Sequence, residues 1–346
     1  MQVQLRPISD QVVVILGAAS GIGRETALRF AREGARVVAA ARDQVALGSL
    51  VDEIQQRGGQ AIYALCDVAH ADNVEGVALA AVDAFGRIDT WVNAAAVSVY
   101  GRFETISEDE FRRVIDVNFM GQVHGARAAL PRLRAEGGAL ISISSVEGRV
   151  GLPLTTAYAA SKFAIEGFLD ALRRELLAEG APISITSIKP ATINTPLFDN
   201  ARTKLGVKPK GPPPFYQPDV VADCVLYAAQ HPVRDLYAGG AGRIMALGEA
   251  LAPRLMDALL SRPMIKAQRT SEPKLPEGPD NLYQPREGES RVEGDFSARA
   301  RRFSVYTWLE THPRAALAAG TVAAGTVALL ARGRGSSDGE TRRWRR

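Results

Sequence analysis

The feature that most constrains the fold is a regular alternation of short apolar runs and longer amphipathic stretches over the first 250 residues. Val12–Leu16, for example, is a β-branched run that ends in Gly17, and an amphipathic stretch from Ile22 to Glu33 follows it. Near-continuous apolar strands that alternate with helices are typical of a parallel sheet covered on both faces. The pattern predicts an α/β fold built on a doubly wound, mostly seven-stranded parallel sheet.

The expected elements follow one another without an internal repeat. The seven apolar runs predicted as strands are Val12–Leu16, Ala35–Ala41, Ala61–Cys66, Ile88–Asn93, Ala139–Ser144, Ile183–Ile188 and Gly242–Leu247. The stretches predicted as helices are Ile22–Glu33, the segment that ends at Arg57, Val74–Phe85, Glu108 to about Leu133, Ala157–Leu177 and Ala250–Leu260.

The composition of the chain changes after residue 250, which predicts three parts. Residues 1–250 form the α/β domain. Residues 251–302 form a helix followed by an extended linker or wrapping arm, because Pro263–Arg302 is rich in proline, glycine and charge. Residues 303–346 hold a short helix at Phe303–Glu310 and a basic tail.

The tail contains one ambiguous segment. Ala315–Ala331 is uncharged, rich in small residues and bounded by Arg314 and Arg332. As a helix it would span about 26 Å, slightly less than the roughly 30 Å of a bilayer core. Flanking arginines could meet anionic headgroups, so a membrane-associated tail and a soluble or partly disordered helix are both open.

Charge and cysteine content narrow the functional classes. The formal charge is +4, but residues 299–346 carry ten basic and three acidic groups, so the preceding domain is slightly acidic. That domain is not expected to bind nucleic acid.

Cys66 and Cys224 have no metal-ligand or CxxC spacing, and the N-terminus lacks a secretory signal. A reducing, cytoplasmic location is expected.

A glycine-rich turn between the first strand and the first helix predicts a dinucleotide site. Gly17, Gly21 and Gly23 have the spacing GxxxGxG. Such glycines permit a tight turn, let the backbone approach a pyrophosphate, and direct a helix N-terminus at negative charge.

The end of the second strand indicates which dinucleotide is bound. A carboxylate there would accept hydrogen bonds from the ribose of NAD, whereas an arginine would accommodate the 2′-phosphate of NADP. The segment ends in Ala41-Arg42, and no carboxylate occurs before Asp43. NADP(H) is therefore favoured, with NAD(H) possible if Arg42 only caps or solvates the next helix.

A tyrosine and a lysine begin the strongest helical pattern. Tyr158 and Lys162 are four residues apart, which places them on one face of a helix. An ammonium nearby, with a positively charged nicotinamide, would lower the pKa of the phenol toward the working range of an acid–base catalyst. Ser145 ends the fifth strand, where its hydroxyl could bind a substrate carbonyl oxygen.

These features together resemble the short-chain dehydrogenase/reductase (SDR) family in its compact Rossmann-fold form, over roughly residues 8 to 250. Leu16–Gly23 resembles the TGxxxGIG loop of that family, and Pro190–Thr195 resembles its PGxxxT turn. The resemblance implies that Asn118, in Asp-Val-Asn-Phe, completes the catalytic set by holding a water that links Lys162 to solvent.

The resemblance also implies further cofactor contacts. Asp67 and Val68 match the pair that contacts adenine, and Asn93–Ala96 resembles the NNAG segment. The complete set of implied cofactor-binding residues is Gly17, Ser20, Gly21, Ile22, Gly23, Arg42, Asp67, Val68, Asn93, Ala94, Tyr158, Lys162, Pro190, Ile193 and Thr195. Leu16, Ala96 and Ala191 depart from the family pattern, and all three lie in segments that the resemblance implies hold the cofactor.

A mostly apolar substrate pocket is expected beside the catalytic group. Its expected walls are Val97–Val99, Val146, Glu147, Leu152, Ala191–Ile193 and a mobile lid at Pro196–Tyr216. Glu147 could bind a polar group of the substrate, or could be a solvent-facing residue at the strand end.

The sequence thus predicts an NADP(H)-dependent oxidoreductase that interconverts a carbonyl and a hydroxyl group on a hydrophobic ketone, aldehyde or secondary alcohol. Two alternatives remain, an SDR epimerase or dehydratase and a catalytically silent NADP-binding interaction protein. By family analogy, a homodimer or homotetramer is expected to assemble through the long helices Glu108–Leu133 and Ala157–Leu177.

Overall fold

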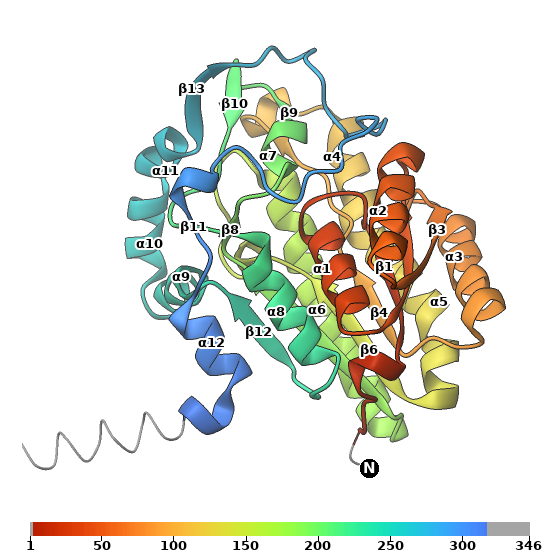
Figure 1. The fold of residues 1–346 in the computed structure, drawn as a ribbon. Coiled ribbons are helices and arrows are strands. Elements are labelled where there is room, and N and C mark those ends of the chain that lie inside the picture. The colour runs from red at the N-terminus through yellow and green to blue at the C-terminus, as the bar shows by residue number, and fades with distance from the viewer. Residues whose placement is uncertain (1–2, 317–346) are drawn as a thin grey trace, which may run out of the picture.

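The computed structural model describes residues 3–316, and its centre is a parallel sheet of seven strands (Figure 1). The strand order across the sheet is β12-β7-β6-β4-β1-β2-β3. The strands are β1 (Val12–Leu16), β2 (Arg36–Ala41), β3 (Gln60–Leu65), β4 (Thr90–Asn93), β6 (Gly138–Ile143), β7 (Ile183–Pro190) and β12 (Asp235–Ala238).

The central strands are apolar along their whole length because helices cover both faces of the sheet. Every residue of β1 is buried, and its side chains alternate between two hydrophobic clusters. Val13 and Ile15 pack with one cluster, whereas Val12 and Val14 pack with the other. This arrangement explains why the strands show no polar alternation in the sequence.

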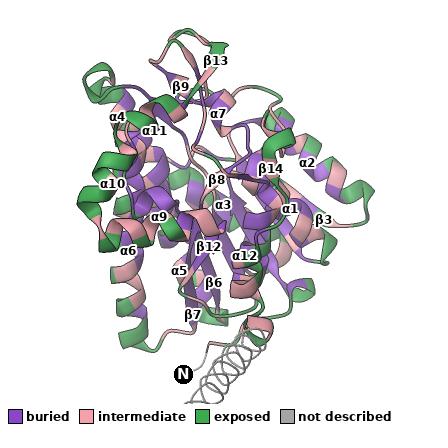
Figure 2. Cartoon of the chain, turned by 90° about the vertical axis from the view of Figure 1, so that its left-hand side faces the viewer, coloured by how far each residue is buried: buried purple, intermediate pink, exposed green. Residues whose placement is uncertain are grey.

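Two layers of helices sandwich the sheet (Figures 1 and 2). One hydrophobic cluster holds side chains of α1 (Gly21–Arg32), α2 (Gln44–Gln56) and α8 (Pro218–Ala228). The other holds side chains of α3 (Ala71–Phe85), α4 (Glu108–Ile115), α5 (Gly121–Glu136) and α6 (Thr156–Glu179). The doubly wound α/β fold expected from the sequence is confirmed.

The prediction of the seventh strand is wrong. Gly242–Leu247, expected as a strand, lies inside α9 (Gly240–Leu251), and the last strand of the sheet is β12. β12 pairs only with β7, so it is an edge strand of four residues and leaves little apolar signal in the sequence. A short, mostly apolar run does not by itself distinguish a strand from a helix.

The helix expected from Glu108 to about Leu133 is interrupted in its middle. Between α4 and α5, Asp116–Met120 forms a π-helical turn, in which the backbone hydrogen bonds span one residue more than in an α-helix. Single π-turns of this kind occur frequently at functional sites. This one carries Asn118.

The chain after the sheet folds back over the domain. Beyond α9 come α10 (Pro253–Leu260), α11 (Arg262–Ala267) and β13 (Arg269–Pro273), so the stretch expected to be extended from Pro263 begins as a helix and becomes extended only at Arg269. Residues 274–296, called the C-terminal arm below, then run across the molecule to β14 (Ala300–Arg301) and α12 (Val305–Thr311). The short helix expected at Phe303–Glu310 is therefore confirmed.

Short strands tie these later segments to the domain. β13 pairs with β10 (Val207–Pro209), and β14 and β8 (Thr192–Ile193) flank β11 (Phe215–Tyr216). β5 (Val99–Tyr100) pairs with β9 (Arg202–Thr203), and the small helix α7 (Leu197–Asn200) precedes β9. The expected lid at Pro196–Tyr216 thus consists of α7 and three of these strands.

Within residues 3–316, no helix has both the length and the apolar character needed to cross a bilayer. The candidate membrane segment Ala315–Ala331 lies, apart from its first two residues, outside the described part of the chain.

Candidate active site

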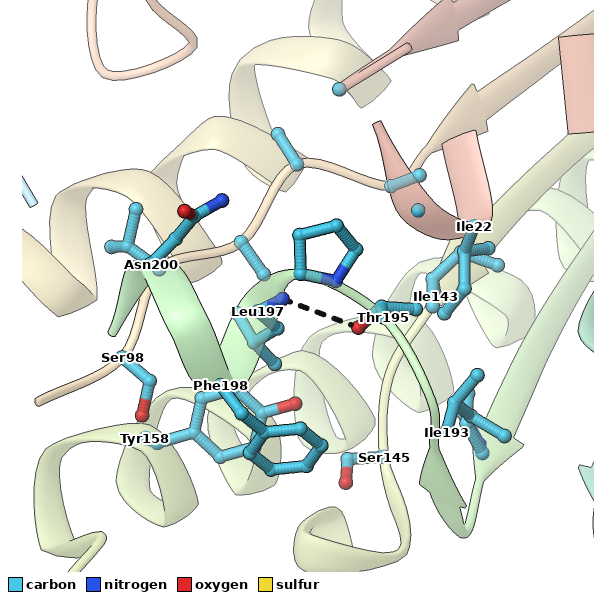
Figure 3. A pocket seen from close by; sticks show the side chains of 18 of the residues that line it. Ile22, Ser98, Ile143, Ser145, Tyr158, Ile193, Thr195, Leu197, Phe198 and Asn200 are labelled. Atoms are coloured by element: carbon cyan, nitrogen blue, oxygen red, sulfur yellow. Dashed lines mark hydrogen bonds between the residues drawn. The ribbon is translucent and has the colours of Figure 1, made fainter. Parts of the chain in front are cut away.

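A cavity lies at the carboxyl edge of the sheet, where β1, β2, β4, β6 and β7 end (Figure 3). Because all strands of the sheet are parallel, the loops that follow them meet at this edge. The turn between β1 and α1 forms one wall of the cavity, and the start of α6 forms another. The segment after β7, including Thr195, Leu197 and Phe198, lies between them.

The turn between β1 and α1 requires glycine at two positions. Gly17 has a φ of 87°, and a side-chain carbon built on it would lie 2.6 Å from the backbone nitrogen of Ala95. A side-chain carbon on Gly23 would lie 2.0 Å from the carbonyl oxygen of Gly17. These close approaches shape a turn that fits the phosphates of a dinucleotide against the N-terminus of α1.

Most of the residues implied to bind the cofactor line this one cavity, and Asn93 is the exception. The side chain of Asn93 is buried behind the wall, where its Oδ1 accepts a hydrogen bond from Trp91 Nε1 at 2.9 Å. The implied residues that line the cavity are Gly17, Ser20, Gly21, Ile22, Gly23, Arg42, Asp67, Val68, Ala94, Tyr158, Lys162, Pro190, Ile193 and Thr195.

Three of the four expected catalytic side chains meet in the cavity. Figure 3 shows the Tyr158 phenol and the Ser145 hydroxyl in the same cavity, and the serine hydroxyl is near enough to lower the pKa of the phenol. Lys162 Nζ lies 5.3 Å from the centre of the Tyr158 ring and donates a hydrogen bond of 2.9 Å to the Ile143 carbonyl. The end of β6 therefore orients the ammonium beside the phenol.

The pKa of Tyr158 is shifted in the opposite direction to the one expected from Lys162. Burial raises the pKa of the phenol above its ordinary value of 10.0, and the negative charge of Glu147 raises it further. The nearby Ser145 hydroxyl opposes both effects and lowers the pKa of the phenol. The protein's own groups thus keep the phenol protonated, which is the form that donates a proton.

Lys162 and Glu147 are two buried ionisable groups whose pKa values are both shifted. Burial lowers the pKa of Lys162 to about 8, although the charges of Glu147 and Glu166 oppose this. Burial raises the pKa of Glu147 to about 7, opposed by a hydrogen bond from Thr155 and by the charge of Lys162. Groups with such shifted values are typical of functional sites.

The solvent-facing interpretation of Glu147 is wrong. Its side chain is 9% exposed and lines the cavity, and Thr155 Oγ1 donates to its carboxylate at 2.7 Å. Glu147 is the second residue of a short 3₁₀ turn, Val146–Gly148, that comes shortly after β6. Ser145 caps the start of this turn, since the Glu147 amide donates to Ser145 Oγ at 3.0 Å. The turn directs the carboxylate inward.

Asn118 is fully buried behind the cavity and does not line it. Its Oδ1 accepts from the Val97 amide at 2.8 Å, while its Nδ2 donates to the Val97 carbonyl at 3.0 Å and to Ser161 Oγ at 3.1 Å. The π-helical turn thus holds the wall segment after β4 in place, and the polar atoms of the Asn118 side chain are already in use.

Arg42 lies at the end of β2 and lines the cavity, as expected. Its guanidinium donates to two carbonyl oxygens of the C-terminal arm, those of Asn281 at 2.6 Å and Tyr283 at 2.9 Å. Asp67 is paired with Arg113 at 2.6 Å, and Arg113 in turn donates to the arm carbonyl of Leu282 at 3.0 Å. The arm therefore covers the side of the cavity where an adenosine would lie.

The sequence did not indicate several residues of the cavity wall. α9 contributes Gly242 and Met245, but that segment was assigned to a strand. Tyr100 lies at the end of β5, one residue beyond the expected range. The C-terminal arm contributes Asn281, Pro285, Arg286 and Glu289. A wrapping arm was expected from composition, but composition does not indicate which surface an arm covers.

Comparison with known proteins agrees with this geometry. The family model described as short chain dehydrogenase matches residues 11–206. The chain is 39% identical over 327 residues to the uncharacterized oxidoreductase YxnA of Bacillus subtilis, covering 93% of this chain and 92% of the relative. It is 38% identical over 208 residues to dehydrogenase/reductase SDR family member 7B of Bos taurus, covering 58% and 63% of the two chains.

A solved structure is similar as well. The alcohol dehydrogenase of the archaeon Thermococcus sibiricus, complexed with 5-hydroxy-NADP, has a TM-score of 0.58 and 26% sequence identity to this chain. The similarity covers 66% of this chain and 95% of the archaeal one. With its parallel sheet, its glycine turn and the extent of these matches, the chain belongs to the short-chain dehydrogenase/reductase family of oxidoreductases.

Proposed function

We propose that the protein is an NADP(H)-dependent oxidoreductase that interconverts a carbonyl and a hydroxyl group, with Tyr158 as the acid and base. One observation carries this proposal: Ser145, Tyr158 and Lys162 line the same cavity as the glycine turn that fits a dinucleotide. A binding protein without turnover would not need a protonated phenol and a serine hydroxyl in the same cavity as a nucleotide cradle.

Each side chain has a role that follows from its position. The dinucleotide, when bound, supplies or accepts the hydride. During reduction, Ser145 binds the carbonyl oxygen of the substrate and polarises it, and Tyr158 donates its proton to that oxygen. Lys162 stabilises the phenolate that remains and binds the nicotinamide ribose, as the family resemblance implies. During oxidation the same groups act in reverse.

The proton on Tyr158 must be restored from solvent after each reduction. The family resemblance assigns this relay to a water held by Asn118 next to Lys162. Because the Asn118 side chain is engaged by Val97 and Ser161, we infer that its main-chain carbonyl would hold such a water.

The preference for NADP(H) over NAD(H) rests on Arg42, whose guanidinium lines the adenosine side of the cavity. Asp43 lines the cavity too, and one of its oxygens accepts from the Ala46 amide at 3.1 Å. Its other oxygen, Oδ2, is buried without a partner among the described residues. It could accept from a ribose hydroxyl, so NAD(H) binding stays an alternative.

The proposed substrate is a hydrophobic ketone, aldehyde or secondary alcohol. Apolar side chains surround the catalytic group, and they are Val97, Val146, Leu152, Ile193, Leu197, Phe198 and Met245. Glu147 and Tyr100 are polar groups in the same wall and could bind a second oxygen or a nitrogen of the substrate.

The proposal is tested by following nicotinamide absorbance over a panel of ketones, aldehydes and alcohols with both cofactors. Tyr158→Phe should reduce turnover at least about a thousandfold while dinucleotide affinity, measured by fluorescence, changes less than about threefold. Retained turnover in this variant would remove Tyr158 from the central role. Dinucleotide binding without turnover of any substrate would favour the silent binding protein, and a product isomerised without net redox change would favour an epimerase.

Two further expectations stay predictions. Assembly as a homodimer or homotetramer through α4, α5 and α6 is expected from the family resemblance. Exposed apolar side chains on α6, at Phe163 and Leu177, support this choice of surface. A cytoplasmic location is the second, with Ala315–Ala331 either associated with a membrane or forming a soluble or partly disordered helix.

A further inference from the structure

The C-terminal arm crosses the cavity from its adenosine side to its glycine turn. At one end, the carbonyl oxygens of Asn281 and Tyr283 accept the two hydrogen bonds from Arg42. At the other end, the carbonyl of Arg291 accepts a hydrogen bond of 2.9 Å from the Gly21 amide, at the first residue of α1. The residues between these points therefore lie above the place where the diphosphate of a dinucleotide would sit.

The arm is anchored to the domain at several points. Leu282 is fully buried in the hydrophobic cluster beneath it. Asp280 is paired with Arg202 at 2.8 Å, and the Asn281 amide donates to the Asn200 carbonyl at 2.9 Å. Further along, Phe296 stacks on Phe215 with ring centres 4.6 Å apart. These contacts make the arm a built wall of the cavity.

Arg286 is the cationic side chain that this wall presents to the cavity. Its Nη1 donates to the neutral amide oxygen of Asn200 at 2.9 Å. Among residues 3–316, no carboxylate oxygen forms an ion pair with it within 4.0 Å. The neighbouring Arg291 differs, since it is paired with Glu289 at 3.0 Å and with Asp295 at 2.9 Å. The positive charge of Arg286 is thus left available to an anion.

The position of Asn200 indicates which part of a dinucleotide Arg286 would meet. Asn200 ends α7, which begins just after Thr195. The Thr195 side chain faces the glycine turn, because its Cβ lies 3.2 Å from where a side-chain carbon on Gly21 would be. Along the arm, Arg286 also lies between Tyr283, which contacts Arg42, and Arg291, which contacts Gly21, so it faces the part of the cavity between the adenosine side and the glycine turn, where a diphosphate would lie.

We propose that Arg286 binds the diphosphate of the dinucleotide, as a second cationic ligand that acts together with the N-terminus of α1. A guanidinium offers several donors in one plane, which suits phosphate oxygens, and a helix N-terminus stabilises the same negative charge. The C-terminal arm is then part of the cofactor site, although it lies beyond the dinucleotide-binding core at residues 1–250. This inference rests on the proposed function.

The test measures binding of NADPH and of NADH by fluorescence titration, without substrate. Because both dinucleotides share the diphosphate, Arg286→Gln should weaken both by a similar factor of about ten or more. Arg42→Gln should weaken NADPH much more than NADH, because only NADPH carries the 2′-phosphate. Arg254→Gln, the same change on the exposed surface of α10, is the matched control and should leave both affinities within about twofold.

Two companion variants separate the effect of the Arg286 charge from the effect of its contact with Asn200. Arg286→Lys keeps the charge and should restore part of the affinity. Asn200→Ala removes the partner of Arg286 and keeps its charge, so its affinity loss should be smaller than that of Arg286→Gln. Equal affinities of Arg286→Gln and the wild type would overturn the inference, as would a loss confined to NADPH, which would place Arg286 at the 2′-phosphate. A wild type that binds neither dinucleotide would instead refute the proposed function.

Discussion

At the scale of single residues, Glu147 shows how burial changes the chemistry of an ordinary side chain. It lies two residues after Ser145, and its carboxylate is enclosed with Tyr100, Tyr158 and Lys162. Burial also raises the pKa of the Tyr100 phenol, so this phenol is uncharged near neutral pH. Lys162 carries the positive charge of this cluster. The charge on Glu147 therefore affects both the stability of the fold and the acidity of Tyr158.

We expect the pH dependence of stability to reveal Glu147. Its pKa in the folded protein is about 7, above the ordinary 4.5, so the folded state binds more protons than the unfolded state between these values. The contribution of Glu147 to stability is therefore present below about pH 4.5 and is lost as the pH rises to about 7, by roughly 3 kcal/mol. Glu147→Gln should lack this loss, and urea denaturation at pH 5 and pH 8 measures the difference.

The pH profile of turnover provides the companion measurement. With Gln at position 147 the negative charge that raises the pKa of Tyr158 is gone, so the alkaline limb of the profile should move to lower pH. Identical profiles and identical stability differences for the variant and the wild type would show that Glu147 does not titrate in this range.

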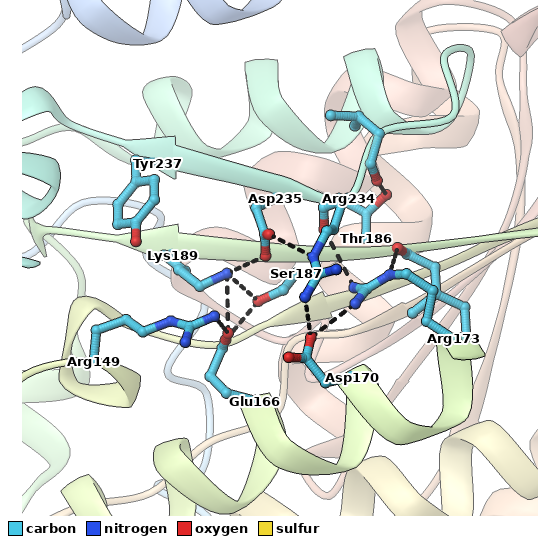
Figure 4. A network of polar contacts seen from close by, with 12 residues as sticks. Arg149, Glu166, Asp170, Arg173, Thr186, Ser187, Lys189, Arg234, Asp235 and Tyr237 are labelled. Atoms are coloured by element: carbon cyan, nitrogen blue, oxygen red, sulfur yellow. Dashed lines mark hydrogen bonds and ion pairs between the residues drawn. The ribbon is translucent and has the colours of Figure 1, made fainter. Parts of the chain in front are cut away.

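At the scale of elements, a buried ionic network joins the edge of the sheet to α6 (Figure 4). Lys189 on β7 is fully buried, and its Nζ lies 3.0 Å from the Glu166 carboxylate on α6 and is also bound to Asp235 on β12. Arg149 reaches Glu166 from the other side at 3.1 Å. The network connects an edge strand of only four residues to the helix that carries Tyr158 and Lys162.

Removing the central cation of this network should be costly. Lys189→Met leaves the Glu166 and Asp235 carboxylates facing each other without the amine, so we expect a loss of about 3–5 kcal/mol in the free energy of unfolding. The triple variant Lys189→Met, Glu166→Gln, Asp235→Asn should recover part of that loss, because no uncompensated buried charge remains. Denaturant titration measures both, and a loss below about 1 kcal/mol for Lys189→Met would contradict this interpretation.

The elements also show where prediction from the sequence succeeds. Strands β1, β2, β3, β4, β6 and β7 could be predicted because each carries an apolar run, and α6 because its periodicity is long. β12 and α9 could not be predicted. The strand is short and lies at the sheet edge, and the helix borders the cavity with the short apolar run Ile244–Leu247. The local sequence does not specify which other helix or strand an element will pack against or pair with.

At the scale of the whole molecule, the C-terminal segments return to the cofactor domain instead of forming a separate unit. α12 contacts β12 through Glu310, which accepts from the Tyr237 amide at 2.9 Å, and through Thr307, which accepts from the Gly239 amide at 2.9 Å. The tail that begins after α12 therefore leaves from a defined place on the domain.

We expect the tail to decide any association with membranes. If Ala315–Ala331 binds lipid, the full chain should sediment with vesicles that contain anionic lipid, and a variant that ends before Arg314 should remain in the supernatant. Dinucleotide binding by both forms is the control for intact folding. Equal distribution of the two forms would end the membrane hypothesis.

The sequence by itself determined the parallel α/β sheet, the glycine turn and the residues proposed as the catalytic group, because these depend on local spacing and on strand order. Only the tertiary structure decided that Glu147 faces inward, that Asn93 and Asn118 lie behind the wall, and that the arm brings Arg286 over the cavity. Those outcomes depend on contacts between segments that are far apart in the sequence, such as Arg42 with Tyr283, which are 241 residues apart. Residue type and periodicity do not encode such pairings locally, so folding of the whole chain is what brings the site together.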